Sequence, residues 1–461
     1  MALNDLLTSR KSLGIWGFGV VGKSVAQFLT DYPVKLSVME KRSLSDQEKE
    51  YCTQHSITFF SEEQKSEFLN SNDVIIPSPG IDLRDDAHYR SKFLSELDIF
   101  SEIFTKPIIS VTGTVGKTST THFLSTFLSQ SMRVATGGNI GTGMLDLIAH
   151  QENKDCAVLE LSSFQLEYCK MFAPQLAIWT NLYPNHLDRH GTMEQYLKAK
   201  LNIMCNQKSG QHALVPVDLL KFDAIKNYLA CAPQLVSFFS EQKIDIHELN
   251  AIKTHKLFWI EDDKIVVHQN GLTKPLIAIE ELPKHSFVEN WIAVVAAAEI
   301  LNKPIDPIRT ISFESDVLSH RLEAIKTKQG IIFFDDSKGT IAQSTLAAVR
   351  SFNNQPLVLM LGGLSKGVDR SALIAELPST IKAIICFGKE ADQLAQWCAA
   401  RNFIHYSCPT LEDAFQACTS YADAQTPVLF SPSGSSYDLF TDYKMRGKRF
   451  KELVAQHYTI L

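Results

Sequence analysis

The stretch I-I-S-V-T-G-T-V-G-K-T-S-T-T at residues 108–121 decides the fold of this chain. The apolar run over 108–111 predicts a buried strand, the turn over 113–116 contains two glycines, and a helix is predicted over 118–128. Such a junction points several backbone N–H groups and a helix dipole at one place, which favours an anion. Lys117 at its edge would suit a polyphosphate, and Thr118 could supply a hydroxyl ligand for Mg²⁺.

Taken alone, this motif leaves an alternative open. The strict phosphate-loop spacing places a glycine five residues before the Gly116-Lys117 pair, and that position is Val111. An ordinary glycine-rich turn between a strand and a helix would show the same residues. The rest of the chain has to decide between the two.

A second glycine motif, G-F-G-V-V-G, occupies residues 17–22. It follows an apolar run over 13–16 and precedes a helical pattern, and a further run over 35–39 ends at Glu40. This arrangement is typical of the βαβ half of a dinucleotide-binding fold. It predicts a site for a nucleotide or its diphosphate, with NAD as the default ligand from the motif alone and a turn without a ligand as the alternative.

A carboxylate in the predicted strand over 157–161 is the next chemical feature. Glu160 lies among apolar residues, where a charge is costly unless it is paired or bound to a metal. A helix predicted over 193–205 carries Tyr196 and Lys200 one turn apart on the same face. By contrast, residues 210–282 show short strand-like runs and polar turns with no recognisable chemistry.

The last part of the chain predicts a further α/β unit, with strands over 331–334, 357–361, 383–387 and 428–430. Polar residues gather directly after these strands, as in D-D-S-K at 335–338 and S-P-S-G-S-S at 431–436. Ligands of open parallel sheets bind outside the carboxyl ends of the strands. We therefore expect a binding site there.

Composition limits the class of protein. With 461 residues, 45% hydrophobic residues, 21% charged residues and a net charge of −6, the chain is expected to form about three globular domains. It has no basic block for a nucleic acid and no apolar run of the ~20 residues that cross a bilayer. The start of the chain lacks a secretory pattern. Nine cysteines without a C-x-x-C pair fit reduced, buried thiols of a cytoplasmic protein.

Four motifs in a fixed order resemble the Mur ligase family, ATP-dependent enzymes that join an amino acid to a peptidoglycan precursor. They are T-G-T-V-G-K-T at 112–118, H-L-D-R-H-G-T-M-E-Q-Y-L-K-A-K at 186–200, S-H-R-L-E at 319–323 and D-S-K-G-T at 336–340. The resemblance covers the whole chain. It implies an α/β protein of three domains: a Rossmann-like UDP-binding domain over 1–95, a phosphate-loop ATP-binding domain over 96–316 and a Rossmann-like domain for the amino acid over 317–461.

Three more segments resemble the family members that add D-glutamate to UDP-N-acetylmuramoyl-L-alanine. They are E-L-S-S-F-Q-L-E at 160–167, L-G-G-L-S-K-G at 361–367 and S-P-S-G-S-S-Y-D-L-F at 431–440. The resemblance implies an acyl-phosphate intermediate, with ATP and Mg²⁺ as cofactors and a cytoplasmic monomer. Two alternatives lie within the family: a ligase that adds L-alanine and a folylpolyglutamate synthetase. Two others belong to different classes: an NAD-dependent oxidoreductase and a non-catalytic nucleotide-binding module.

The resemblance also implies a role for individual residues. Catalysis would involve Lys117, His186, Lys200 and Lys338, and the metal ligands would be Thr118, Glu160, His186 and, if it is carbamylated, Lys200. ATP would be bound by Gly113, Thr114, Val115, Gly116, Lys117, Thr118, Ser119, Asn290, Arg321 and Asp336. The UDP-substrate would be bound by Gly17, Gly19, Val20, Val21, Gly22, Glu40, Arg42, Gly80, Asn139, Ser162 and Gln165. D-glutamate would be bound by Lys338, Thr340, Lys366, Ser436 and Tyr443.

Four positions depart from the family pattern. Val115 and Ile341 stand where asparagine is usual, and Val21 replaces a common hydroxyl residue. Phe287 occupies the place of an asparagine that helps to hold adenine. These departures concern nucleotide contacts, whereas the residues implied in phosphoryl transfer are all present.

Overall fold

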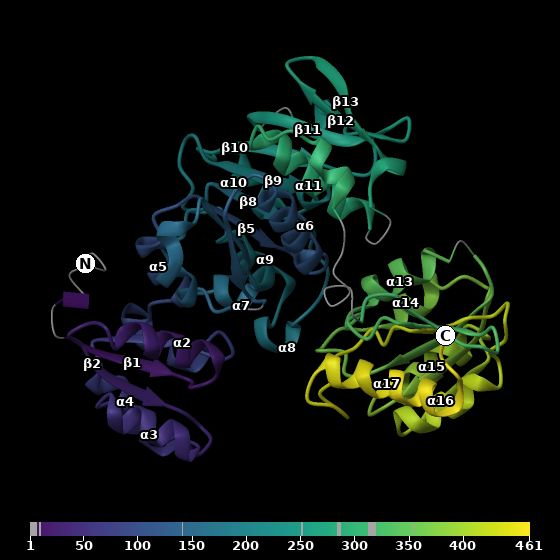
Figure 1. The fold of residues 1–461 in the computed structure, drawn as a ribbon, viewed down its shortest axis with the longest axis horizontal. Coiled ribbons are helices and arrows are strands. Elements are labelled where there is room, and N and C mark those ends of the chain that lie inside the picture. The colour runs from purple at the N-terminus through teal and green to yellow at the C-terminus, as the bar shows by residue number, and fades with distance from the viewer. Residues whose placement is uncertain are drawn as a thin grey trace. The chain divides into compact units, whose positions relative to one another are not determined.

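The computed structural model describes residues 7–8, 11–140, 142–249, 252–283, 287–311, 320–352 and 354–461. The chain divides into two compact units, Met1–Leu182 with Glu194–Ile311 and Tyr183–Met193 with Ser312–Leu461. Three sheets, each accompanied by helices, are visible in Figure 1. The predicted α/β class is confirmed. The expected domain boundary at residue 316 falls outside the described residues.

The first sheet, in the first unit, has four strands in the order β3-β2-β1-β4, all parallel. Its strands are β1 Ser12–Trp16, β2 Lys35–Met39, β3 Thr58–Phe60 and β4 Val74–Pro77. Its helices are α2 Val20–Leu29, α3 Asp46–Gln54 and α4 Lys65–Ser71. Parallel pairing with intervening helices places the G-F-G-V-V-G turn at the carboxyl end of β1, as the βαβ pattern predicted.

The second sheet completes the first unit, with nine strands in the order β13-β12-β11-β10-β9-β8-β5-β7-β6. The parallel strands are β5 Ile108–Thr112, β6 Val134–Gly138, β7 Cys156–Glu160, β8 Leu176–Trp179, β9 His212–Pro216 and β10 Leu235–Phe239. β5 and β7 are buried along their whole length, which explains their nearly continuous apolar sequences.

The edge of this sheet could not be predicted from the sequence. β11 Thr254–Glu261 pairs parallel to β10, and then antiparallel to β12 Lys264–Gln269, which pairs antiparallel to β13 Leu272–Ala278. These strands form the labelled ribbon at one end of the sheet in Figure 1. The segment over 210–282 therefore extends the scaffold.

Further helices accompany the second sheet. They are α5 Glu96–Ile103, α6 Lys117–Ser129, α7 Ser163–Leu166, α9 Met193–Leu201, α10 Asp223–Ala230 and α11 Val288–Ile300. Of these, α6 and α11 pack on the strands of the sheet. The rings of Phe123 on α6 and Trp291 on α11 stack with centroids 4.4 Å apart and planes at 3°. This stack fixes α11 against α6. The helix predicted over 193–205 ends earlier, at Leu201.

The third sheet belongs to the second unit and has the order β14-β15-β19-β16-β17-β18. Its strands are β14 Glu323–Lys326, β15 Ile332–Asp335, β16 Leu357–Gly362, β17 Ile381–Phe387, β18 His405–Cys408 and β19 Val428–Phe430. Only β14 pairs antiparallel among the described strands of this sheet. The helices are α8 Leu187–His190, α13 Ala342–Arg350, α14 Ser371–Glu376, α15 Ala391–Ala400, α16 Leu411–Thr419 and α17 Tyr443–His457.

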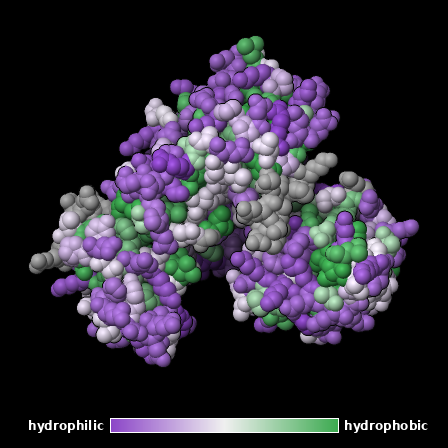
Figure 2. Space-filling model, viewed as in Figure 1, coloured by the Kyte–Doolittle hydropathy of each residue, from purple (hydrophilic) through white to green (hydrophobic). Residues whose placement is uncertain are grey.

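The burial of the cysteines differs from the expectation drawn from composition. Of the nine cysteines, Cys205 and Cys231 are exposed and the other seven are buried, so the expectation that all are buried is wrong. Among the described residues no helix combines the length and apolar character that a membrane span requires. Hydrophilic residues cover most of the face in Figure 2.

Candidate functional site

The turn between β5 and α6 is shaped around its second glycine. Gly116 has a φ of 81°, and a Cβ added there would lie 2.3 Å from Oδ1 of Asn290. Only glycine fits this position without strain. Asn290, near the start of α11, thus lies against the phosphate-loop turn, and its Oδ1 also accepts a hydrogen bond from Oγ1 of Thr120 at 3.4 Å.

Two residues that follow β8 hold the turn from outside. Oδ1 of Asn181 accepts hydrogen bonds from the backbone N–H groups of Thr114 (3.2 Å) and Val115 (2.9 Å). Nδ2 of Asn181 and Oγ1 of Thr180 both donate to the carbonyl oxygen of Val115, at 3.1 and 2.7 Å. Because these bonds engage Thr114 and Val115, the N–H groups at the start of α6 are the better placed donors for an anion. Asn181 is not among the site residues predicted from the sequence.

Two lysines and a glutamate interact at this turn. Nζ of Lys200 donates to the carbonyl oxygen of Gly113 at 2.7 Å and lies 4.8 Å from the ring centroid of Tyr196. Nζ of Lys117 donates to the carbonyl oxygens of Gly113 and Thr114 at 3.1 and 3.0 Å. Burial and the charge of Lys117 lower the pKa of Lys200 well below its ordinary value, and Glu160 opposes that shift. Burial therefore favours a neutral Lys200 amine.

Glu160 ends β7 beside the last residues of β5, since Val111 pairs with it across the sheet. Its Oε1 accepts a hydrogen bond from Nδ2 of Asn139 at 2.8 Å. Its Oε2 is buried without a hydrogen-bond partner among the described residues. A buried carboxylate oxygen of this kind is costly by itself and is the type of ligand that Mg²⁺ prefers.

The N-terminal glycine turn is organised by Glu40 and Arg42. The carboxylate of Glu40 accepts the backbone N–H groups of Phe18 at 2.7 Å and Lys41 at 2.8 Å. Arg42 forms two 2.7 Å contacts with Glu48 and donates to the carbonyl oxygen of Phe18 at 3.2 Å. Both predicted ligands thus shape the turn that includes Gly17, Gly19, Val20, Val21 and Gly22.

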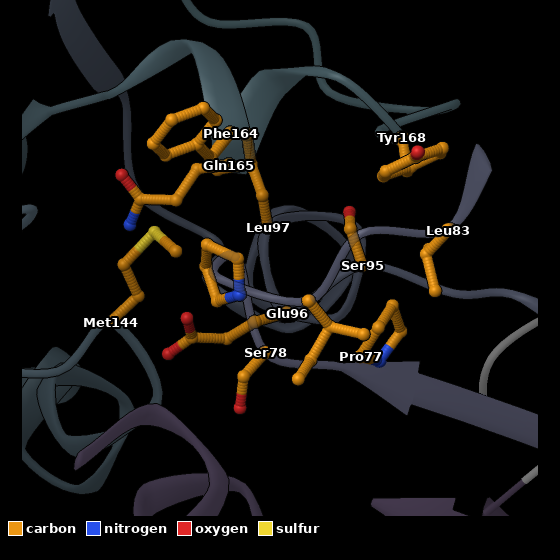
Figure 3. Close-up of a pocket in the computed structure, with 12 residues that line it drawn as sticks. Pro77, Ser78, Leu83, Ser95, Glu96, Leu97, Met144, Phe164, Gln165 and Tyr168 are labelled. Carbon is orange, nitrogen blue, oxygen red and sulfur yellow. The ribbon is translucent and has the colours of Figure 1, made fainter. Parts of the chain in front are cut away.

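A small cavity with a volume of about 20 Å³ lies within the first unit (Figure 3). The cavity is lined by residues that follow β4, including Ser78. Glu96 of α5, Gln165 of α7 and Met144, which lies between β6 and β7, also line it. Ser78 lies two residues before Gly80, so two of the predicted UDP-substrate regions meet here. Oε1 of Gln165 accepts hydrogen bonds from the N–H and hydroxyl groups of Ser162, both at 3.0 Å.

Glu96 is an unexpected member of this cavity. Its carboxylate accepts backbone hydrogen bonds from Met144 and Leu145, yet burial dominates and raises its pKa to about 7. Oε1 is buried without a hydrogen-bond partner among the described residues. Glu96 is not among the site residues predicted from the sequence.

The second unit holds the residues predicted for D-glutamate. Nζ of Lys338 lies 5.4 Å from the ring centroid of Tyr443, whose ring makes an edge contact with His320 at 6.2 Å. Asp336 accepts a 2.6 Å hydrogen bond from Ser431, and burial raises its pKa to about 7, against the lowering effect of Arg321. Ser436 is buried and Thr340 is half-buried. Ser319, which opens the S-H-R-L-E motif, lies outside the described residues.

His186 is also in the second unit, at the residue before α8. It has a φ of 55°, and its carbonyl oxygen accepts the N–H groups of Arg189 and His190 at 3.1 and 2.9 Å. This left-handed conformation is uncommon for a residue with a side chain. The structure thus groups Lys117, Glu160 and Lys200 in one unit, and His186, Lys338 and Tyr443 in the other.

Three family models match successive parts of the chain. The family model described as "Mur ligase MurD-like, N-terminal domain" matches residues 11–91. The model described as "Mur ligase middle domain" matches 111–298, and that described as "Mur ligase, glutamate ligase domain" matches 320–434.

Two relatives carry the same name, UDP-N-acetylmuramoylalanine–D-glutamate ligase. The protein of Chlorobium phaeobacteroides is 31% identical over 471 residues, which cover 98% of this chain and 99% of the relative. That of Syntrophus aciditrophicus is 32% identical over 450 residues, or 95% and 96% of the two chains.

Solved structures show the same fold. A pseudomurein peptide ligase type C from Methanothermus fervidus matches with a TM-score of 0.56 at 16% identity, over 97% of this chain and 100% of that chain. The UDP-N-acetylmuramate-alanine ligase of Thermotoga maritima matches with a TM-score of 0.54 at 17% identity, over the same shares of the two chains. At these identities the likeness concerns the fold alone.

Proposed function

This chain belongs to the Mur ligase family, and we propose on that premise that it adds D-glutamate to UDP-N-acetylmuramoyl-L-alanine with consumption of ATP. The observation that carries this choice of substrates is the 31% identity to a D-glutamate ligase over 98% of the chain. The UDP-N-acetylmuramate-alanine ligase of Thermotoga maritima, whose name gives alanine as its amino acid, shares the fold at only 17% identity. The oxidoreductase alternative leaves the phosphate-loop region without a role.

The arrangement around Lys117 supports ATP chemistry. A carboxylate that attacks a γ-phosphate meets strong charge repulsion, so the site must supply positive charge and oriented N–H donors. Lys117 and the start of α6 offer both, and Asn181 fixes the turn that presents them. Asn290, Arg321 and Asp336 are proposed to complete the nucleotide contacts.

Glu160 supports the expected divalent cation, because its Oε2, which has no hydrogen-bond partner in the part of the chain that the structure describes, suits Mg²⁺. We propose that Thr118 and Glu160 ligate Mg²⁺, that His186 is a ligand of a second Mg²⁺, and that Lys200, if carbamylated, supports the metal site. When bound, Mg²⁺ neutralises charge on the transferring phosphoryl group. The lowered pKa of Lys200 is consistent with carbamylation, since only the neutral amine adds to CO₂.

The reaction follows from these assignments. An oxygen of the L-alanyl carboxylate attacks the γ-phosphorus, the bond to ADP breaks, and an acyl phosphate forms. The amine of D-glutamate then attacks the acyl carbonyl carbon, gives up a proton, and phosphate leaves as the amide forms. The chain's contribution is to position these groups and to stabilise charge. Lys338, Thr340, Lys366, Ser436 and Tyr443 would hold the dicarboxylate, for which lysine and hydroxyl donors are suited.

We propose that the UDP-substrate uses the glycine turn at 17–22 and the surface around Ser78 and Gln165, which line the small cavity of Figure 3. Three further statements remain predictions. They are the domain limits 1–95, 96–316 and 317–461, the monomeric state and the cytoplasmic location.

The test is phosphate release by the purified chain with ATP, MgCl₂ and UDP-N-acetylmuramoyl-L-alanine, comparing D-glutamate, L-glutamate, L-alanine and glycine. D-glutamate should be the only good acceptor, and the amide product should be seen by mass spectrometry. Turnover with L-alanine on UDP-N-acetylmuramate, or with a folate and L-glutamate, would replace the proposal by one of its alternatives.

A further inference from the structure

A buried arginine joins two loops in the second unit. Arg370, which is 2% exposed, precedes α14. Its Nη1 donates to the carbonyl oxygen of Gly362 at 2.9 Å and to Oγ of Ser433 at 3.2 Å. Its Nη2 donates to the carbonyl oxygen of Gly363 at 3.0 Å. One guanidinium group thus binds the turn after β16 and the loop after β19.

Glu390 completes the clamp from the other side of the same turn. Its Oε2 contacts Nη2 of Arg370 at 2.6 Å, and its Oε1 accepts the N–H and hydroxyl groups of Ser365 at 3.0 and 3.2 Å. The Arg370–Glu390 pair therefore holds the turn over 362–365 at both ends.

The two loops are also bonded directly. Leu364 and Ser435 exchange backbone hydrogen bonds of 2.9 and 2.8 Å. A Cβ added to Gly434 would lie 2.4 Å from the carbonyl oxygen of Gly362 and 2.8 Å from Nη1 of Arg370. The two loops are therefore tied to each other by backbone hydrogen bonds as well as by Arg370.

The residues that follow these anchors are two of the predicted ligands of the incoming amino acid. Lys366 comes directly after Ser365 and has a φ of 55°, and Ser436 comes directly after Ser435 and is 3% exposed. A change in the clamp would therefore alter the spacing between the Lys366 cation and the Ser436 hydroxyl.

Stability alone does not explain a buried ion pair, because the desolvation of both charges offsets much of their attraction. Burial lowers the pKa of Arg370 and Glu390 raises it. An apolar side chain of similar length would fill the same space. The substitution would remove the donors that hold the carbonyl oxygens of Gly362 and Gly363 and the hydroxyl oxygen of Ser433.

We propose that Arg370, held by Glu390, is a positioning residue that sets the affinity for the incoming amino acid by fixing the Lys366 turn against the Ser436 loop. The inference rests on the proposed function, because it assumes that Lys366 and Ser436 bind that substrate.

The test compares Arg370→Met, Arg370→Lys and Glu390→Gln in the full chain, with Arg350→Met as the matched control. Arg350 lies on α13 of the same unit and pairs with Glu376 at 3.0 Å, but its side chain is 71% exposed. KM for D-glutamate, KM for ATP and the urea midpoint are measured for each. Arg370→Met should raise KM for D-glutamate about tenfold or more, the size expected for lost charge-assisted hydrogen bonds.

KM for ATP should stay within about twofold, Arg370→Lys should recover part of the loss, and Arg350→Met should behave as the wild type. Glu390→Gln, which keeps Arg370, should give a smaller rise and serves if Arg370→Met does not fold. An unchanged KM for D-glutamate, or equal rises for both substrates, would overturn the inference. The wild-type acceptor panel separately tests the proposed function. If another amino acid is the acceptor, the same comparison is made with it.

Discussion

The amino group of Lys200 lies 2.7 Å from the carbonyl oxygen of Gly113, 87 residues earlier in the chain. This contact joins α9 to the first residue of the phosphate-loop turn. Because the Lys200 side chain is 1% exposed and faces the charge of Lys117, the site favours an uncharged amine. A neutral amine avoids a second cation at the same turn, and carbamylation would convert the amine to an anion.

The first prediction concerns the pH dependence of stability. The folded-state pKa of Lys200 is lowered, so the unfolded chain takes up this proton at higher pH than the folded chain does. The unfolding free energy of the wild type should therefore fall as pH decreases from about 10 toward 7, relative to Lys200→Met. Thermal midpoints in CO₂-free buffers would measure this. Parallel profiles of the two proteins would contradict it.

The second prediction concerns Lys117. Lys117→Met removes the ammonium group that lies over the carbonyl oxygens of Gly113 and Thr114. Ligation should fall about 10²- to 10³-fold, as when one donor to a transition-state oxyanion is removed. Phosphate release measures the loss. Lys198→Met, at an exposed position of α9, should leave the rate unchanged, and full activity of Lys117→Met would refute the assignment.

The third prediction concerns the buried carboxylate at the end of β7. Glu160→Gln keeps the size of the side chain but removes the charge whose Oε2 lacks a partner among the described residues. Activity should fall about 10²-fold and need more Mg²⁺ for half-maximal rate, while the thermal midpoint stays equal or rises. A chelator should abolish wild-type ligation. The exposed Glu194 provides the control, Glu194→Gln. An unchanged Mg²⁺ dependence would exclude Glu160 as a ligand.

The fourth prediction concerns the carboxyl group in the cavity of Figure 3. The folded-state pKa of Glu96 is raised from 4.5 to about 7, so the folded chain keeps a proton that the unfolded chain loses. Wild-type stability should decline between about pH 4.5 and 7 and then level off. Glu96→Gln should be more stable than the wild type at pH 8, by at most about 3 kcal/mol, and equal to it near pH 4.5.

Urea unfolding at pH 5 and pH 8 measures this difference. Glu102→Gln, an exposed position on the same helix, should show no pH-dependent gain. A pH-independent effect of Glu96→Gln would mean that the carboxyl group is charged throughout.

Much of the scaffold was predictable because local pattern and burial agree there. The run over 108–111 and the helix after Gly116 became β5 and α6, with the helix one residue longer at each end than the predicted 118–128. The runs at 331–334, 357–361, 383–387 and 428–430 correspond to β15, β16, β17 and β19. Buried parallel strands have continuous apolar sequences, which a single sequence displays clearly.

Other features could not be predicted, because their sequence pattern is too weak. β11 to β13 form an antiparallel ribbon whose β13 is largely exposed, so its polar residues resemble a loop. Cys205 and Cys231 are exposed although cysteine is usually buried, because only the tertiary fold decides which face of a helix or turn meets water. Asn181 gave no sign of its role, since its partners at Thr114 and Val115 lie more than 60 residues away.

The sequence by itself determined the α/β class, the phosphate-loop junction and the family, because these depend on residues close together or in a fixed order. The tertiary structure alone decided that Lys200 lies beside Gly113, that Glu96 is buried in a cavity, and that Arg370 joins two loops. The reason is physical: burial and hydrogen bonding between distant segments exist only after the sheets have formed, and they set both the pKa values and the geometry on which the chemistry depends.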